Sequence, residues 1–146
     1  MSGIVGGAGS KSGVIGTTEL DYEEGSWTPV PNTGSISSIV MSYYRKIGGL
    51  CFLQTSLGNI QGGFGTLTGL PFSTIEHGAG YETASGNLMV NHVNMDDDTY
   101  QIAMYVYNNS IILYQSRDNQ SWASVTEGMM ENNDDMIMAC SYFCPK

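Results

Sequence analysis

The chain has 146 residues, about the length of one domain and enough to bury a core without disulfides or a metal ion. Its 19 glycines and a charged fraction of only 13% favour many short strands joined by turns. The net charge of −9 reflects a total of only 5 lysines and arginines, so the cationic surface that nucleic acids and anionic membranes require is not expected.

The cysteines and the hydropathy pattern narrow the class of protein further. Cys51, Cys140 and Cys144 are odd in number and show no CxxC spacing, so we expect buried, reduced thiols and neither a zinc site nor a disulfide framework. No apolar run reaches the length of about 18 residues that predicts a membrane span. The N-terminus shows no basic segment followed by an apolar one, so secretory export is not expected.

The first 20 residues are rich in glycine and serine and predict an extended N-terminal arm. Residues 2–6 (SGIVG) and 12–16 (SGVIG) are near copies that flank a glycine-rich centre. Such glycine density opposes helix formation and provides no core of its own. A phosphate-binding loop is not expected, because no strand precedes the glycines and no helix follows them. We expect the arm to dock on another subunit through four apolar side chains, Ile4, Val5, Val14 and Ile15; the alternative is a plain linker.

Residues 21–31 (DYEEGSWTPVP) mark the boundary between this arm, residues 1–20, and a β domain that we predict over residues 21–146. The two aromatic side chains of the boundary, Tyr22 and Trp27, are expected in the core or at a subunit interface. The prolines that follow exclude an interior strand position, so the segment predicts an edge strand or a corner.

Two neighbouring carboxylates in this boundary, Glu23 and Glu24, are a candidate pair for acid–base chemistry. Neighbours in an extended segment point to opposite faces, which prevents both from converging on one substrate. A solvated turn is therefore the favoured interpretation.

The next segment predicts a β-hairpin. Residues 36–47 and 50–57 are rich in β-branched and aromatic side chains, and Gly48 and Gly49 between them form a strong turn signal. Arg45 and Lys46 lie near the tip, where charged side chains usually stay solvated and protect a strand edge.

Three motifs in this half, together with the glycine-rich leader, resemble a module of bacteriophage structural proteins. They are DYEEGSWTP at residues 21–29, YRKIG at residues 44–48 and GTLTGLPF at residues 65–72. Their order and spacing are similar to the YEEGTWTP, YxKIG and GLPF pattern of tail-fibre and other virion-appendage modules of marine and cyanobacterial phages. The match spans residues 2–72, with a faint echo in residues 136–143.

The resemblance implies an all-β, commonly trimeric and non-enzymatic virion component. With the strand pattern it predicts an antiparallel, jelly-roll-like β-sandwich: a homotrimeric tail-fibre-like or tail accessory protein, made in the host bacterial cytoplasm and anchored to other virion proteins through its arm. The open alternatives are a capsid decoration or head-fibre protein, and a tip that binds a host receptor or cell-surface glycan. The sequence departs from the pattern at residues 49–51, where Gly-Leu-Cys replaces a polar residue and valine, and the chain lacks a fibre's long shaft.

Apolar runs in the second half predict the remaining strands. The hairpin formed by residues 99–107 and 111–116 around a turn at residues 108–110 is the best marked. Residues 99–107 and 136–143 are apolar on both faces, which is typical of a central strand or a subunit interface. The side chains expected to anchor the core from the preceding segment are Phe64, Leu67, Leu70 and Phe72.

Three candidate sites in this half have weak sequence support. Asp96, Asp97 and Asp98 could bind Ca²⁺ with Asn94, but the spacing, glycine and distal glutamate of a calcium loop are missing, so a solvated turn is favoured. The aromatic residues that could stack on a sugar, most of them expected in the core or an interface, are Tyr81, Tyr100, Tyr105, Tyr107, Tyr114 and Trp122. The carboxylates available for glycoside hydrolysis show no informative spacing and are Asp118, Glu127, Glu131, Asp134 and Asp135. We therefore expect neither an enzyme nor a cofactor.

Overall fold

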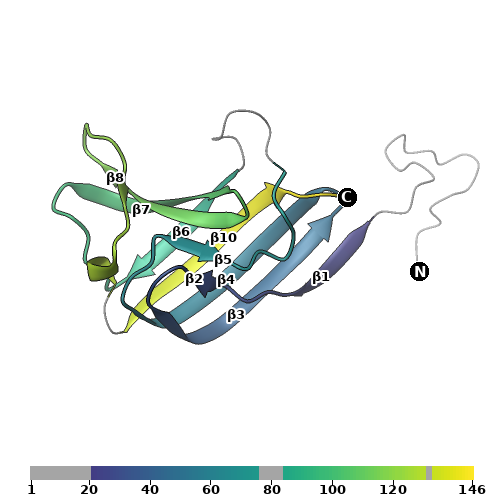
Figure 1. Cartoon of the computed structure of the whole chain (residues 1–146), viewed down its shortest axis with the longest axis horizontal. Coiled ribbons are helices and arrows are strands. Elements are labelled where there is room, and N and C mark those ends of the chain that lie inside the picture. The colour runs from purple at the N-terminus through teal and green to yellow at the C-terminus, as the bar shows by residue number, and fades with distance from the viewer. Residues whose placement is uncertain (1–20, 76–83, 131–132) are drawn as a thin grey trace, which may run out of the picture.

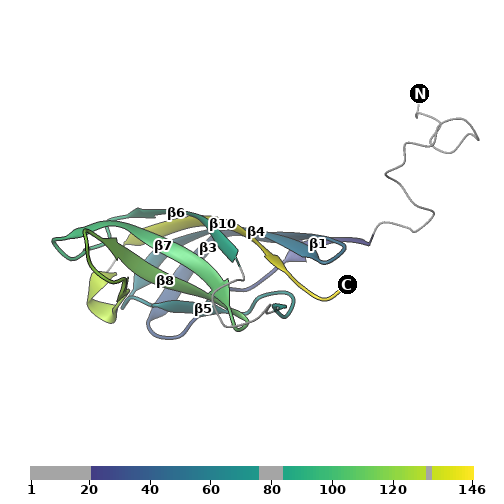
Figure 2. The ribbon, with the colours of Figure 1, turned by 90° about the horizontal axis from the view of Figure 1, so that it is seen from above.

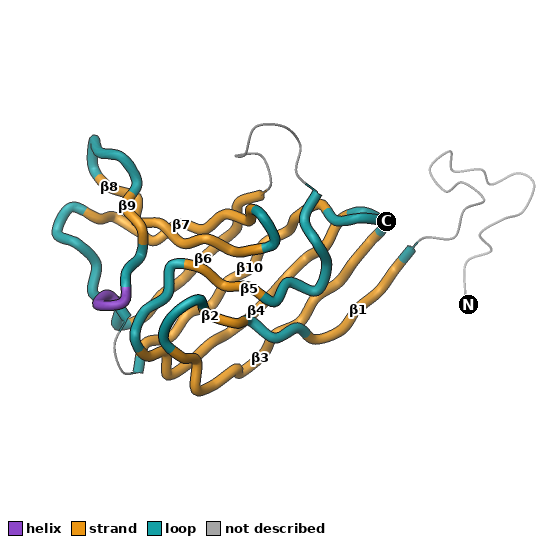
Figure 3. The backbone as a smooth tube through the Cα atoms, in the orientation of Figure 1, coloured by secondary structure: helices purple, strands orange, loops and turns teal. Residues whose placement is uncertain are grey.

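The computed structural model describes residues 21–75, 84–130 and 133–146, which form ten antiparallel strands and a short 3₁₀ helix. The strands are β1 (Tyr22–Ser26), β2 (Val30–Pro31), β3 (Ser35–Ile47), β4 (Leu50–Gln61), β5 (Thr66–Thr68), β6 (Ala84–Asn91), β7 (Thr99–Tyr107), β8 (Ser110–Arg117), β9 (Ala123–Ser124) and β10 (Asp134–Phe143). The helix η1 (Glu127–Met129) is purple in Figure 3. The predicted all-β, antiparallel fold is confirmed. The predicted arm and its four docking side chains, Ile4, Val5, Val14 and Ile15, lie outside the described residues.

The strands follow one hydrogen-bonded path in the order β1-β3-β4-β10-β6-β7-β8-β5-β2, with β9 paired to β8. This sheet curls into two layers, as the view in Figure 2 shows. We call β1, β3, β4, β10 and β6 the first layer, and β7, β8, β9, β5 and β2 the second layer (Figure 1). None of the described helices is long and apolar enough to cross a membrane.

The hydrophobic core lies between the layers and draws on every long strand. Phe64 and Leu67 are fully buried in it, and Leu70 and Phe72 pack partly buried against it. Trp27 is also buried here, at 6% exposure, in the segment that connects β1 of the first layer to β2 of the second. The other large buried side chains include Leu57, Ile60, Val106, Ile111, Leu113, Met130, Met136, Met138 and Tyr142.

The two hairpins expected from the sequence are present. β3 and β4 pair from Ile47↔Leu50 outward, around a turn in which Gly48 has a φ of 58°. β7 and β8 pair from Tyr107↔Ser110 outward. The turn asparagines of this second hairpin adopt φ values of 46° and 59°, a left-handed conformation that asparagine tolerates.

The expectation that Lys46 is solvated is wrong. Its side chain is only 8% exposed, its Nζ donates to the Asp21 carboxylate at 3.0 Å, and it lies 5.1 Å from the centre of the Phe72 ring. Strand alternation places Lys46 on the inner face of β3, where its apolar stem packs against the domain. Its ammonium group pairs with the Asp21 carboxylate and lies over the Phe72 ring. Arg45, on the opposite face, is 68% exposed, as expected.

The proline-containing segment forms an edge strand, as the prolines predict. Val30 and Pro31 pair with Thr68 and Leu67 of β5, at one end of the sheet path. Gly69 follows with a φ of +86°, and a side chain there would collide with the backbone oxygen of Thr28. This close approach fixes the edge strand against β5.

We predict that Gly69→Ala destabilises the fold by about 2–4 kcal/mol, because the left-handed backbone and the contact with Thr28 both oppose a Cβ atom. Gly48→Ala is the matched control, since its φ is +58° but nothing lies within 4 Å of an added Cβ; it should cost about 1 kcal/mol. Urea unfolding of the two variants measures the difference. An equal decrease in the free energy of unfolding of both variants would show that the contact between Gly69 and Thr28 contributes nothing to stability.

Candidate functional site

The outer face of the second layer carries a row of aromatic side chains. In β7 the side chains of Ile102, Met104 and Val106 are buried in the core, so alternation turns Tyr105 and Tyr107 outward. Their β8 neighbours follow the same rule: Ile111, Leu113 and Gln115 are buried, and Tyr114 faces outward. These outward tyrosines are half-buried, because they cover one another.

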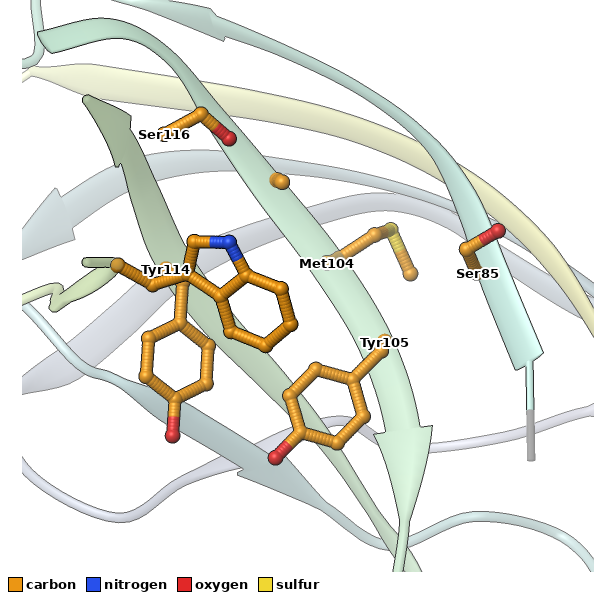
Figure 4. A pocket seen from close by; sticks show the side chains of 7 residues that line it. Ser85, Met104, Tyr105, Tyr114 and Ser116 are labelled. Atoms are coloured by element: carbon orange, nitrogen blue, oxygen red, sulfur yellow. The ribbon is translucent and has the colours of Figure 1, made fainter. Parts of the chain in front are cut away.

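The rings form a continuous aromatic shelf. Tyr105 and Tyr114 stack with ring centres 5.7 Å apart and planes 17° apart. Trp122 stands next to Tyr114, at 5.9 Å and 56°, and Tyr107 lies 6.4 Å from Tyr105. Figure 4 shows Tyr105 and Tyr114 side by side, with Ser116 beyond them and Ser85 across on the neighbouring strand.

This shelf borders a cleft of about 240 Å³, which we call the aromatic cleft. Its described lining consists of Ser85, Ala103, Met104, Tyr105, Tyr114, Ser116 and Trp122. The described lining therefore contains aromatic, aliphatic and hydroxyl groups and no carboxylate, imidazole or cationic group. Such a surface can bind a ligand by stacking and hydrogen bonding, but these residues offer no acid–base pair.

Trp122 is held over the cleft by the short strand that follows it. β9 pairs with β8 through Tyr114↔Ser124, which brings the indole beside the Tyr114 ring. Trp122 is 64% exposed and therefore lies outside the core of the domain. Tyr100, on the same strand as Tyr105, is exposed away from the cleft, and Tyr81 lies outside the described residues.

A buried amide supports the cleft from beneath. Gln115 is 1% exposed; its Oε1 accepts from Thr99 Oγ1 at 2.7 Å and from the Asp96 amide at 3.1 Å, and its Nε2 donates to the Asp96 carboxylate at 3.0 Å. These bonds tie the turn before β7 to the middle of β8. A buried polar group satisfied in this way fixes the strands that carry the tyrosines.

The acidic cluster forms a turn, as expected. Two of its carboxylates, those of Asp96 and Asp98, contact other side chains of the same chain. Arg117 contacts the carboxylates of Asp96 at 3.7 Å and Asp98 at 2.9 Å, and Gln120 donates to Asp98 as well. Within the described parts of the chain, no group of three or more histidine, cysteine, aspartate or glutamate side chains could hold a metal ion.

The candidate carboxylate pair of the boundary segment is split between two faces. Tyr44 donates to Glu23 at 2.7 Å, whereas Tyr22 donates to Glu24 at 2.6 Å on the opposite face. These hydrogen bonds are the largest cause of a raised pKa at both tyrosines. Of the other carboxylates considered, Asp118, Asp134 and Asp135 do not line the aromatic cleft, and the side chains of Glu127 and Glu131 are outside the described part of the chain.

The outer face of the first layer is a second surface of interest, and we call it the apolar face. Its side chains alternate with the buried ones of β4 and β10 and include Phe52 and Ile137, which are 43% and 42% exposed and lie on either side of the pair Gln54↔Ala139. Ile137 pairs with Met89 of β6, and Phe52 pairs with Arg45 of β3. The large exposed apolar side chains on this face are Tyr22, Tyr43, Ile47, Phe52, Met89, Ile137 and Phe143.

The three cysteines are free and buried, as predicted. Burial raises the pKa of Cys51 to about 11 and that of Cys140 to about 12, and it also raises the pKa of Cys144. Because the thiolate is the nucleophile, these thiols are poor nucleophiles near neutral pH.

Comparison with known proteins finds one kind of likeness. No protein-family model matches the sequence, and no curated protein matches it. The structure resembles the crystal structure of the Dettilon tailspike protein (gp208), with a TM-score of 0.57 and 17% sequence identity. The alignment covers 84% of this chain and 24% of the tailspike chain, so the chain spans about a quarter of the tailspike's length. The likeness shows that this all-β fold also occurs within a phage tailspike.

The raised thiol pKa values predict that the free energy of unfolding decreases as pH rises from about 9 to about 11. In that window the unfolded thiols ionise while the buried ones largely keep their protons, which favours the unfolded state by an amount on the order of 2 kcal/mol for each thiol. Urea midpoints measured across this range test the effect. A Cys51→Ala, Cys140→Ala double variant should lose much of the decline, and an unchanged decline in that variant would contradict the assignment.

Proposed function

We propose that this chain is a non-enzymatic component of a phage tail that assembles with copies of itself through its apolar face. The observation that carries this proposal is the cluster of exposed apolar side chains on the outer face of the first layer. The tailspike likeness supports a tail role over the alternative of capsid decoration. The motifs shared with virion-appendage modules in residues 2–72 support the same assignment.

The apolar face supplies part of the area that an interface between copies needs. Its four aromatic side chains are 43–59% exposed, and at 150–250 Å² each they alone present roughly 300–500 Å². Isoleucines and a methionine enlarge this area. A monomer's largest apolar patch is about 300–600 Å², and a standard interface covers about 800 Å² per partner. A contact of this size between copies would bury surface that is otherwise costly to expose.

The charges around the apolar face also favour a second copy as the occupant. The chain carries a net charge of −9, so two copies repel one another wherever acidic groups face each other. On this face, Arg45 lies 3.8 Å from Glu24. The exposed Asp135 lies toward its β6 side, with Asn91 3.5 Å away. Copies packed on this face would therefore bring few like charges together.

We further propose that the assembly is a trimer and that residues 1–20 attach it to another virion protein. The trimer follows from the resemblance to tail-fibre modules, and attachment follows from the repeated Ile-Val pairs of the arm. In this arrangement the apolar faces pack around a common axis, and the second layers of all subunits face outward.

We predict that the full chain sediments with three times the mass of one chain and that Ile137→Lys shifts it toward the monomer. A lysine in the middle of the apolar face would place an unpaired charge in every interface, so the dissociation constant should rise at least tenfold. Tyr100→Lys is the matched control, because Tyr100 is 69% exposed on a strand of the second layer. Sedimentation equilibrium measures both.

Two results would contradict this proposal. One is a wild-type chain that stays monomeric over the whole accessible concentration range. The other is an assembly that survives Ile137→Lys and breaks with Tyr100→Lys. Circular dichroism of each variant checks that the change in mass does not arise from unfolding.

The attachment role of the arm predicts a separate outcome. A chain that lacks residues 2–16 should keep its trimeric mass but fail to enter phage particles. The truncation removes the apolar side chains proposed to bind the other virion protein, which are Ile4, Val5, Val14 and Ile15. Incorporation of the truncated and full chains into particles can be compared by immunoblotting. Equal incorporation would show that attachment uses another surface.

A further inference from the structure

The aromatic cleft has a feature that core packing does not require. A two-residue strand positions Trp122 beside the stacked tyrosines, yet the indole stays 64% exposed. Large aromatic side chains usually gain stability by burial, so an indole held at the rim of a cleft indicates a surface made for contact.

The depth of the cleft comes from the way two strands separate. Among the described residues, β6 and β7 pair through Ala84↔Val106 and Ser85↔Tyr105 alone, whereas β6 continues along β10 as far as Asn91. The seam between them therefore opens beside Ser85, and Met104 contributes to the lining from the core side. Figure 4 shows Ser85 on one strand facing Met104 and Tyr105 on the other.

The shape of the aromatic shelf suits a saturated ring that presents C–H groups on its faces. Tyr105 and Tyr114 lie nearly parallel, and Trp122 is tilted by 56° to Tyr114, so the indole and the tyrosines enclose an angle. A ring that enters this angle contacts aromatic surface with its apolar side. Hydroxyl groups of Ser85 and Ser116 border the cleft and can bond to the polar edge of such a ring.

The charge of the cleft selects among ligand classes. The described lining holds no ionisable group other than the tyrosine phenols, and the whole chain carries a net charge of −9. Phosphorylated and acidic ligands would meet no cation in this lining and would be repelled by the chain as a whole. An acyl chain would leave the bordering hydroxyls without partners. A neutral pyranose, with C–H groups on its faces and hydroxyls around its edge, matches both kinds of lining group.

We propose that the aromatic cleft binds a neutral carbohydrate, with one pyranose ring stacked on the shelf formed by Trp122, Tyr114 and Tyr105 and its hydroxyls directed to Ser85 and Ser116. The cleft lies where β6 meets β7, and its aromatic side chains belong to the second layer, so we expect sugar binding not to depend on self-assembly. The described lining offers no carboxylate pair for hydrolysis, so the ligand is held without being cleaved.

Titration of the full-length chain with maltotetraose, chitotriose and mannotetraose tests this proposal. Binding should have a dissociation constant on the order of 1 mM for at least one of these neutral sugars. Trp122 should become protected from acrylamide quenching, while the other tryptophan, Trp27, is already buried. An acidic trisaccharide of galacturonate should bind at least tenfold more weakly than the best neutral sugar.

Matched variants separate the cleft from other effects. Trp122→Ala and Tyr114→Ala should each weaken binding at least tenfold, Trp122→Phe less, and Tyr100→Ala not at all. All four should keep the sedimentation mass of the wild type, so loss of sugar binding is distinguishable from loss of assembly. Three results would overturn the proposal. The wild-type chain could bind none of the neutral sugars, it could bind the acidic sugar more tightly than the neutral ones, or Trp122→Ala could keep the wild-type affinity.

Discussion

The fold depends on the pairing of β10, the last strand, with two partners that come much earlier in the chain. Its residues Met136–Phe143 pair with β4, and Asp135–Cys140 pair with β6. The β3–β4 hairpin and the β7–β8 hairpin would otherwise lack a shared sheet. Pairing between distant segments first costs the entropy of closing a long loop and is repaid only when the contacts have formed. We therefore expect the two layers to join only after the C-terminal strand has been made. Its inward side chains, Met136, Met138 and Tyr142, then complete the core.

This curled sheet buries its inner surface and leaves two outer faces with different chemistry. The apolar face lies on long strands and presents aliphatic and aromatic side chains with polar ones such as Gln54 among them. The aromatic cleft lies where β6 and β7 diverge, and it combines ring surfaces with hydroxyl groups. A broad face of apolar side chains suits contact between proteins, whereas a small cleft of rings and hydroxyls suits a sugar. One domain can therefore assemble on one side and bind on the other.

Local signals in the sequence were sufficient to place both hairpins, because glycine and asparagine turns and alternating side chains act over a few residues. Partners that meet only in the fold were not predictable. Lys46 was expected in solvent because the sequence does not show that Asp21 and Phe72 meet it. Trp122 and Tyr114 were recognised as aromatic candidates, but their meeting depends on a two-residue strand that carries almost no sequence signal. Ser85 and Ser116 of the cleft were not predicted, because a single serine in a strand carries no sequence signal for ligand binding.

Hydroxyl-radical footprinting of the assembled chain, read residue by residue by mass spectrometry, tests the division of roles between the two faces most directly. The account predicts that Phe52, Met89 and Ile137 are labelled more slowly than their exposure in one chain implies, while Trp122 and Tyr114 are labelled at the rates of accessible side chains. Rapid labelling of the apolar face together with protection of Trp122 would contradict it, because the second layer would then be the surface that copies of the chain cover.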